Sequence, residues 1–320
     1  MRKYIFLVGG ILSLSFLLSG LLAPPTIAVR SRALVAQGQS HHWNSGLLGI
    51  REKVVYERIH YHNLTLYLFH PRQRAVPGRP VVIYIHGGAL RYGSALISQR
   101  RTPHNRLMVA VERQLIQAGV DFISVNYRLA PLHPWPDALI DVKHALSYLG
   151  AHAALLDING HQMAVMGDSA GGELSSFVGL TMNSANTERP LVRAVVDLFG
   201  PTNRRVFASE WRKRFGLAPN PVYGVYTWRR AIRESAVTYV HPGAPPFLIV
   251  QGTQDTIVPP SQSALLKKKL HHAGVPVQEI LVHHAGHELI PVGGPIHPGI
   301  PVIARHIVRF LTKQLVVRQT

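Results

Sequence analysis

The chain carries the stretch Met-Gly-Asp-Ser-Ala-Gly-Gly at residues 166–172. The apolar run before it, 162–165, predicts a buried strand, and the run of small and apolar residues after it, 173–181, predicts a helix. A strand, a G-x-S-x-G pentapeptide and a helix in this order are typical of a nucleophile elbow. Glycines two residues before and after Ser169 are needed because side chains there would clash in so tight a turn. The stretch therefore predicts a serine exposed at the top of a sheet.

Length and composition limit the class of protein to which the chain can belong. The chain has 320 residues, no cysteine and a formal net charge of +18. Its length is enough for one large α/β domain that buries roughly 75% of its unfolded surface. Without cysteine there are no disulfides, thiolate nucleophiles or cysteine-bound metals. The basic residues are scattered and form no nucleic-acid motif, so we expect a solvated basic surface and no nucleic-acid partner.

The N-terminus resembles a targeting segment. Arg2 and Lys3 precede an uncharged run over residues 4–23. Such a run is longer than a usual signal-peptide core and long enough to span a bilayer. We expect residues 1–29 to be either a signal peptide or an N-terminal membrane anchor, with membrane association through 4–23 in the second case. Both alternatives predict an extracytoplasmic protein, either membrane-anchored or secreted into the cell envelope.

The remaining chain predicts a polar linker over residues 30–52 and one domain over residues 53–320. The domain begins with an antiparallel hairpin (53–61 and 64–70), after which strands and helices alternate. This alternation predicts an α/β fold with a mostly parallel central sheet and helices on both faces. The further expected strands are 80–86, 121–126, 162–165, 192–198, 247–251 and 277–282. The expected helices are 105–119, 137–150, 173–181, 261–273 with Ser261 as N-cap, and 300–316.

One segment is too long for a single crossover. Residues 202–245 lie between two expected strands and combine aromatic residues with many arginines. Insertions of this length are often functional. We expect a lid or an acyl-pocket wall, and the alternative is an ordinary helical excursion with its own aromatic cluster.

A serine nucleophile needs a base, an acid that orients the base, and donors for the oxyanion. Asp255 follows the strand that ends at Gln251, and His287 lies in a glycine-containing loop after the last strand. Ligand sites in α/β sheets lie at these strand ends, and the order Ser, Asp, His is that of α/β hydrolases. The competing residues are Asp157, Asp168, Asp197, His283 and His284. We expect Asp168 to be a neighbour of the site and not a triad member.

The oxyanion donors are expected at the end of the first central strand, which reads His86-Gly87-Gly88-Ala89. Backbone N–H groups of Gly87 and Gly88, together with that of Ala170 after the nucleophile, could point at a developing oxyanion. Loss of one such donor typically costs about 2.7–4 kcal/mol of transition-state stabilisation.

Four segments carry a family resemblance: HGG at 86–88, NYRLAPLHPWPDA at 126–138, GDSAGG at 167–172, and GTQDTIVP at 252–259 with HAGH at 284–287. Over residues 55–315 the chain resembles α/β-hydrolase esterases and lipases of the hormone-sensitive-lipase-like and bacterial feruloyl/acetyl-esterase-like (BD-FAE-like) groups. The resemblance implies a carboxylesterase-type serine hydrolase that works through an acyl-enzyme, with a small-molecule ester substrate and no metal or other cofactor. It assigns the nucleophile to Ser169, the acid to Asp255 and the base to His287.

The same resemblance places the oxyanion donors at Gly87, Gly88 and Ala170. It implies that the YRLAP segment braces the loop below the elbow, with Asp141 holding that region. Ala89 replaces the third glycine of the usual HGGG, although its N–H survives, and Glu173 stands where Asn or His is more usual. These departures concern the substrate, for which we expect short-chain or acetyl esters. The alternatives are a peptidase or lactonase on the same fold, or an inactive, envelope-anchored binding protein.

Overall fold

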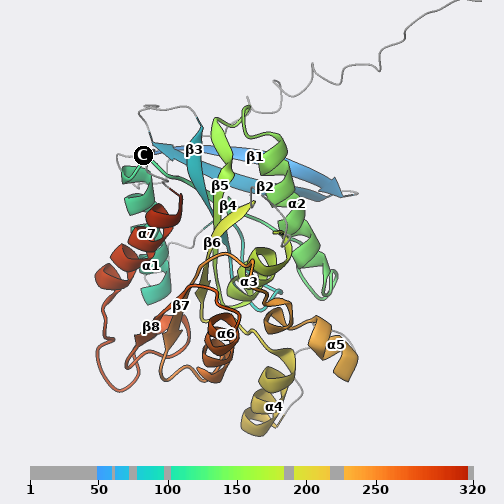
Figure 1. The fold of residues 1–320 in the computed structure, drawn as a ribbon, viewed down its shortest axis with the longest axis vertical. Coiled ribbons are helices and arrows are strands. Elements are labelled where there is room, and N and C mark those ends of the chain that lie inside the picture. The colour runs from blue at the N-terminus through green and yellow to red at the C-terminus, as the bar shows by residue number, and fades with distance from the viewer. Residues whose placement is uncertain are drawn as a thin grey trace, which may run out of the picture. The chain divides into compact units, whose positions relative to one another are not determined.

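The computed structural model describes residues 49–59, 62–71, 78–96, 102–183, 191–216 and 227–315. The strands are β1 (Gly49–Ile59), β2 (His62–Pro71), β3 (Arg79–Ile85), β4 (Asp121–Val125), β5 (Ile158–Asp168), β6 (Val192–Leu198), β7 (Phe247–Gly252) and β8 (Val277–Val282). They form one sheet in the order β1-β2-β4-β3-β5-β6-β7-β8 (Figure 1). β2 pairs antiparallel with β1 and β4, and all pairs from β4 to β8 are parallel. The predicted mostly parallel sheet and the predicted N-terminal hairpin are confirmed.

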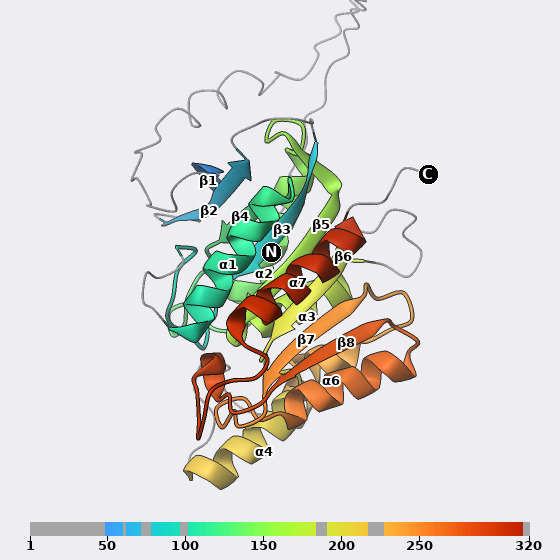
Figure 2. The same cartoon turned by 90° about the vertical axis from the view of Figure 1, so that its left-hand side faces the viewer.

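The helices are α1 (Pro103–Gln117), α2 (Asp137–Ala151), α3 (Ala170–Thr181), α4 (Arg204–Phe215), α5 (Trp228–Arg233), α6 (Ser261–His272) and α7 (Ile300–Leu315). Short 3-10 helices are η3 (Ala236–Tyr239) and η4 (His287–Leu289). α1 and α7 pack against one face of the sheet, and α2, α3 and α6 pack against the other (Figures 1 and 2). The sheet is therefore covered on both faces, as expected for a parallel sheet with buried strands.

Local sequence explains why α7 is buried along one stripe and α3 on nearly all sides. α7 buries Ile303, Ile307 and Phe310 on one stripe, at the spacing of an amphipathic helix against a sheet. α3 is buried on nearly all sides and consists of small and apolar residues. A side chain at Gly179 would meet Val195 of β6 at 2.2 Å, so glycine lets this helix lie close to the sheet. The helix that follows the elbow is thereby packed closely against the sheet.

Two predicted boundaries are wrong. β1 begins at Gly49, so the last residues of the predicted 30–52 linker belong to the hairpin. Ser261 is the first residue of α6 and not its N-cap, because Pro260 occupies the cap position with a near-helical φ of −56°. The Ser261 hydroxyl instead donates to the Glu210 carboxylate of α4.

The expected signal or anchor segment, 1–29, and most of the expected linker lie outside the described residues, so they stay predictions. No helix within the described ranges is long and apolar enough to cross a membrane. The insertion over 202–245 contains α4, α5 and η3, and its residues 217–226 also lie outside the description.

Candidate active site

The elbow forms where the sequence predicts it, between β5 and α3. Ser169 has φ 50° and ψ −117°, an unusual conformation for a residue with a side chain, and its N–H donates to the Leu198 carbonyl at 2.8 Å. A side chain at Gly167 would meet the Gly171 carbonyl oxygen at 2.3 Å, and one at Gly171 would meet the Ile85 carbonyl oxygen at 2.0 Å. Glycine is thus required at both positions because the backbone passes so close. Ser169 is held at the carboxyl end of strand β5.

The structure brings the three expected triad residues together. His287 Nε2 lies 3.0 Å from Ser169 Oγ, and His287 Nδ1 lies 2.8 Å from Asp255 Oδ2. In the tautomer that serves a nucleophile, Ser169 donates to Nε2 while the Nδ1–H of His287 donates to Asp255. The Asp255 side chain is fully buried, whereas that of His287 is 17% exposed. The serine, the base and the acid therefore stand in hydrogen-bonding order.

The loops after β7 and β8 hold the acid and the base. Asp255 Oδ1 accepts the N–H groups of Ile257 and Val258, both at 2.9 Å. Its Oδ2 bonds His287 at 2.8 Å and accepts a longer bond from Gln251 Nε2 at 3.4 Å. Gly252 permits the two loops to touch, since a side chain there would meet the Ala285 carbonyl oxygen at 2.5 Å. Two backbone donors and one imidazole thus fix the carboxylate with little freedom to rotate.

The competing histidines take other roles. His283 forms a backbone bridge with His297 beside the last strand, and the His284 carbonyl accepts the N–H of Val292. The Phe199 ring packs edge-on against His287, with ring centroids 5.1 Å apart. His287 is therefore the histidine at the nucleophile, as its loop position predicts.

The oxyanion assignment needs one correction. The N–H of Gly87 donates to Asp168 Oδ1 at 3.0 Å, so Gly87 is not free to bind an oxyanion. Within the described residues, no acceptor is found for the N–H of Gly88 or for that of Ala89. Ala170 is the first residue of α3, where an N–H has no acceptor inside its own helix. The donor set that fits is Gly88, Ala89 and Ala170.

Asp168 is the residue that occupies the N–H of Gly87. Besides the Gly87 N–H, its Oδ1 accepts the Tyr84 hydroxyl at 2.6 Å, and its Oδ2 lies 3.5 Å from His104 Nε2. The carboxylate therefore ties the loop after β3 to the elbow and to α1. The expectation that Asp168 is a neighbour of the site and not a member of the triad fits this geometry.

The segment that starts at Asn126 braces the same loop from below. The Tyr127 hydroxyl donates to the His86 carbonyl at 2.7 Å, and its ring stacks on His86 with centroids 4.3 Å apart. Arg128 forms a bidentate pair with buried Asp141, with Nη2 to Oδ1 at 2.7 Å. Burial lowers the pKa of His86, which favours a neutral imidazole beneath the loop. The bracing role expected for this segment and for Asp141 is what the contacts provide.

Sequence reasoning missed a buried ion pair beside the nucleophile. Glu173 lies one turn after Ser169, and both its carboxylate oxygens accept from Arg204 Nη2, at 2.6 and 2.8 Å. The two side chains are 1% and 6% exposed. The Arg204 guanidinium also lies 5.7 Å from the ring centre of Trp135. The signal in the sequence was Glu173, an acidic residue at a position where a neutral one is more usual. Its partner Arg204 lies in the 202–245 insertion, and the spacing of the two residues along the chain does not show that they meet.

Asp197, another competing acid, is a structural carboxyl on β6. It accepts the Ser176 hydroxyl and the Gly200 N–H, both at 2.8 Å. Burial raises its pKa to about 6 from an ordinary 3.8. The folded state therefore binds this proton more tightly than the unfolded chain does. The contribution of Asp197 to the free energy of unfolding is fully present below pH 3.8 and is lost as the pH rises through about 6.

Replacing Asp197 with asparagine is expected to remove this loss. The difference in free energy of unfolding between variant and parent should rise from pH 4 to pH 7 by about 2 kcal/mol in favour of the variant. Urea unfolding at several pH values measures it, and the other carboxyls cancel because both proteins carry them. A difference that is constant with pH would contradict the protonation of Asp197.

The sheet order and the site together define an α/β hydrolase with a Ser-His-Asp triad. The chain belongs to the BD-FAE family, whose model matches residues 66–270. Within the described residues, no group of three or more His, Asp or Glu side chains is arranged to hold a metal ion.

Individual relatives of the chain are esterases and lipases. Esterase LipC of Mycobacterium tuberculosis is 31% identical over 212 residues, which is 62% of this chain and 50% of the relative. Hormone-sensitive lipase of Bos taurus is 33% identical over 108 residues, 34% of this chain and 13% of the relative. The chain thus spans about half the length of esterase LipC. The resemblance to esterases and lipases of the α/β-hydrolase fold is confirmed.

Solved structures match over more of the chain. A truncated carbohydrate esterase from gut microbiota superposes with a TM-score of 0.65 at 26% identity, covering 83% of this chain and 96% of the other. An arylesterase structure gives a TM-score of 0.66 at 20% identity, covering 84% and 87%. The second match supports the fold alone.

Proposed function

We propose that the protein is a serine carboxylic-ester hydrolase that acts through an acyl-enzyme on acetyl or other short-chain esters. The observation that carries the proposal is the continuous hydrogen-bond chain from Ser169 through His287 to Asp255. The esterase relatives support the same reaction class. The carbohydrate esterase among the solved structures supports an ester whose alcohol part is polar.

The contacts of the triad support the following steps. Ser169 Oγ attacks the ester carbonyl carbon while His287 Nε2 takes the hydroxyl proton. Asp255 stabilises the imidazolium that forms, and the backbone N–H groups of Gly88, Ala89 and Ala170 stabilise the negative oxygen. When the tetrahedral intermediate collapses, His287 returns the proton to the leaving alcohol, and an ester bond to Ser169 remains. Water then attacks this acyl-enzyme with His287 as base, releasing the carboxylic acid and restoring the serine.

The direct test is covalent labelling and turnover by the unmodified protein. A fluorophosphonate probe should label one site, located to Ser169 by peptide mass spectrometry, and labelling should abolish turnover of p-nitrophenyl acetate. Absence of labelling and of turnover would favour an inactive binding protein. Acetyl, butyryl and decanoyl esters should be compared with the matched anilides and a lactone. Faster turnover of anilides or the lactone would favour a peptidase or lactonase.

The location is proposed separately. The charged start and apolar run over 2–23 support export across a membrane, with this segment either retained as an anchor or removed. N-terminal sequencing of the protein recovered from membrane and extracytoplasmic fractions tests it. Recovery in the cytoplasm with an intact N-terminus would overturn the proposal.

A further inference from the structure

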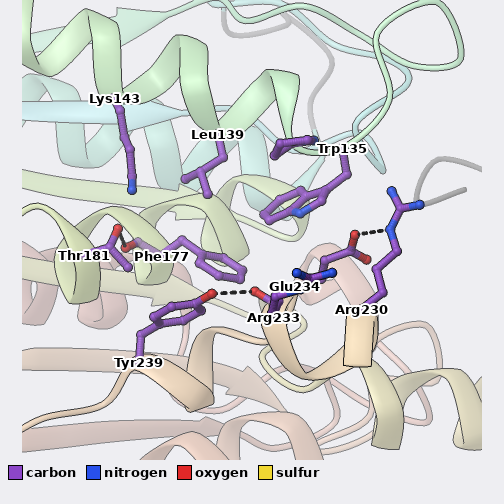
Figure 3. Close-up of a pocket in the computed structure, with 10 residues that line it drawn as sticks. Trp135, Leu139, Lys143, Phe177, Thr181, Arg230, Arg233, Glu234 and Tyr239 are labelled. Carbon is purple, nitrogen blue, oxygen red and sulfur yellow. Dashed lines mark hydrogen bonds and ion pairs between the residues drawn. The ribbon is translucent and has the colours of Figure 1, made fainter. Parts of the chain in front are cut away.

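A second cavity lies apart from the triad, between α2, α3, α5 and η3. Its volume is about 370 Å³, within the usual range for small-ligand sites of roughly 300–1,000 Å³. Phe177 and Thr181 lie two and three turns beyond Ser169 on α3, which places them roughly 12 and 18 Å along the helix from the nucleophile. The lining residues are Trp135, Pro136, Leu139, Lys143, Phe177, Thr181, Arg230, Arg233, Glu234 and Tyr239 (Figure 3). We call this cavity the α2–α5 pocket.

Three aromatic rings form one side of the pocket. Trp135 and Phe177 pack with ring centroids 5.0 Å apart and a tilt of 52°, and Phe177 and Tyr239 pack with centroids 5.6 Å apart. Trp135 and Phe177 are nearly buried, and the Tyr239 hydroxyl is fixed by donation to the Arg233 carbonyl. The rings therefore stand in fixed positions before any ligand arrives, which lowers the entropy cost of binding a flat apolar group.

The charged groups of the pocket do not balance. The lining contains three cations, Lys143, Arg230 and Arg233, but a single carboxylate, Glu234, whose Oε1 accepts from Arg230 Nε at 2.5 Å. Across the part of the chain that the structure describes, neither Lys143 nor Arg233 has a carboxylate within ion-pair distance. Partial burial lowers the pKa of Lys143, as expected for an ammonium that loses hydration without gaining a counter-charge.

Figure 3 shows how these groups are arranged. Lys143 and Thr181 lie at one end, Arg230 and Glu234 at the other, and the Phe177 ring lies between them. A ligand with an aromatic body and a charged end can therefore contact the aromatic side of the pocket and Lys143 at the same time. The net charge of +18 on the chain also favours the approach of anions.

We infer that the α2–α5 pocket binds a small carboxylate with an aromatic body, its carboxylate beside Lys143 and its ring against Trp135, Phe177 and Tyr239. The anion supplies the counter-charge that Lys143 lacks. A neutral aromatic compound leaves Lys143 without a counter-charge, and a simple inorganic anion makes no contact with the aromatic side of the pocket. The inference goes beyond ester hydrolysis and does not depend on it.

Calorimetric titration of the full chain with 2-naphthoate tests the site, with 2-naphthalenemethanol and acetate as the neutral and ring-free probes. Naphthoate should bind at least about tenfold more tightly than either. Lys143→Met should weaken naphthoate binding about fivefold, as expected for one partly exposed charge contact, and should leave binding of the neutral probe unchanged. Arg233→Met should have a smaller effect in the same direction.

The control variants are matched in charge, and Arg229 is exposed like Arg233. Lys268→Met on α6 and Arg229→Met on α5 remove exposed cations that do not line the pocket. These variants should bind naphthoate like the parent. Equal weakening by Lys268→Met and Lys143→Met would mean that only overall charge matters, and equal affinity for naphthoate and naphthalenemethanol would mean that no anion is selected. Either result would overturn the inference, and neither requires any turnover measurement.

Discussion

Replacing Ser169 with alanine is expected to lower kcat for p-nitrophenyl acetate by about 10⁴- to 10⁶-fold. The hydroxyl oxygen is the atom that forms the acyl-enzyme, and no other serine lies in hydrogen-bonding contact with His287 among the described residues. The oxyanion donors and the substrate contacts remain in the variant, so a small residual rate above water is expected. Steady-state kinetics with protein free of parent enzyme measure the loss.

A second serine on the same helix provides the control. Ser175 is fully buried and its hydroxyl has no hydrogen-bond partner in the described structure. Ser175→Ala should therefore leave kcat within about twofold and should not destabilise the fold, because it removes an unsatisfied polar atom. If Ser169→Ala hydrolyses the ester at the parent rate while it no longer reacts with a fluorophosphonate, the acyl-enzyme mechanism is wrong.

The triad could be predicted because its position follows from rules that act locally. The glycine spacing around Ser169 requires a sharp turn, and the strand patterns before Asp255 and His287 place both at the same edge of the sheet. The contacts agree, with both hydrogen bonds of the triad at or below 3.0 Å. The order of the three residues in the chain and their positions at strand ends were sufficient to predict the triad.

Gly87 shows where such reasoning stops. A His-Gly-Gly sequence predicts backbone donors near the site, but not which of them is already bound. Asp168 accepts the Gly87 N–H because β3 and β5 are neighbours, and a side chain at Gly87 would meet Asp168 Oδ2 at 2.3 Å. A hydrogen bond from a backbone N–H to a side chain on a strand that is distant in sequence therefore decides which donors are free. The α2–α5 pocket escaped prediction for the same reason, since its walls come from four separate elements.

The buried pair of Glu173 and Arg204 gives the second large effect. Glu173→Gln keeps the shape of the side chain but leaves the Arg204 charge buried without its counter-ion, and is expected to lower the free energy of unfolding by about 3–5 kcal/mol. Arg204→Met should cost a similar amount because it strands the Glu173 carboxylate. Urea unfolding at neutral pH measures both. The exposed pair of Lys267 and Glu279 is the control, and Lys267→Met should cost less than about 1 kcal/mol.

The double variant separates the charge pair from simple packing. In Glu173→Gln/Arg204→Met no charge is buried, so its loss of stability should be smaller than the sum of the single losses by at least about 2 kcal/mol. Arg204 also begins α4 and donates to the Glu234 carbonyl, so the single variants should speed amide hydrogen exchange in α4 while α6 exchanges as in the parent. Strictly additive losses with unchanged exchange in α4 would contradict a pair that fixes the insertion to the elbow helix. Coupled losses would make Glu173 the residue through which the nucleophile helix α3 holds helix α4.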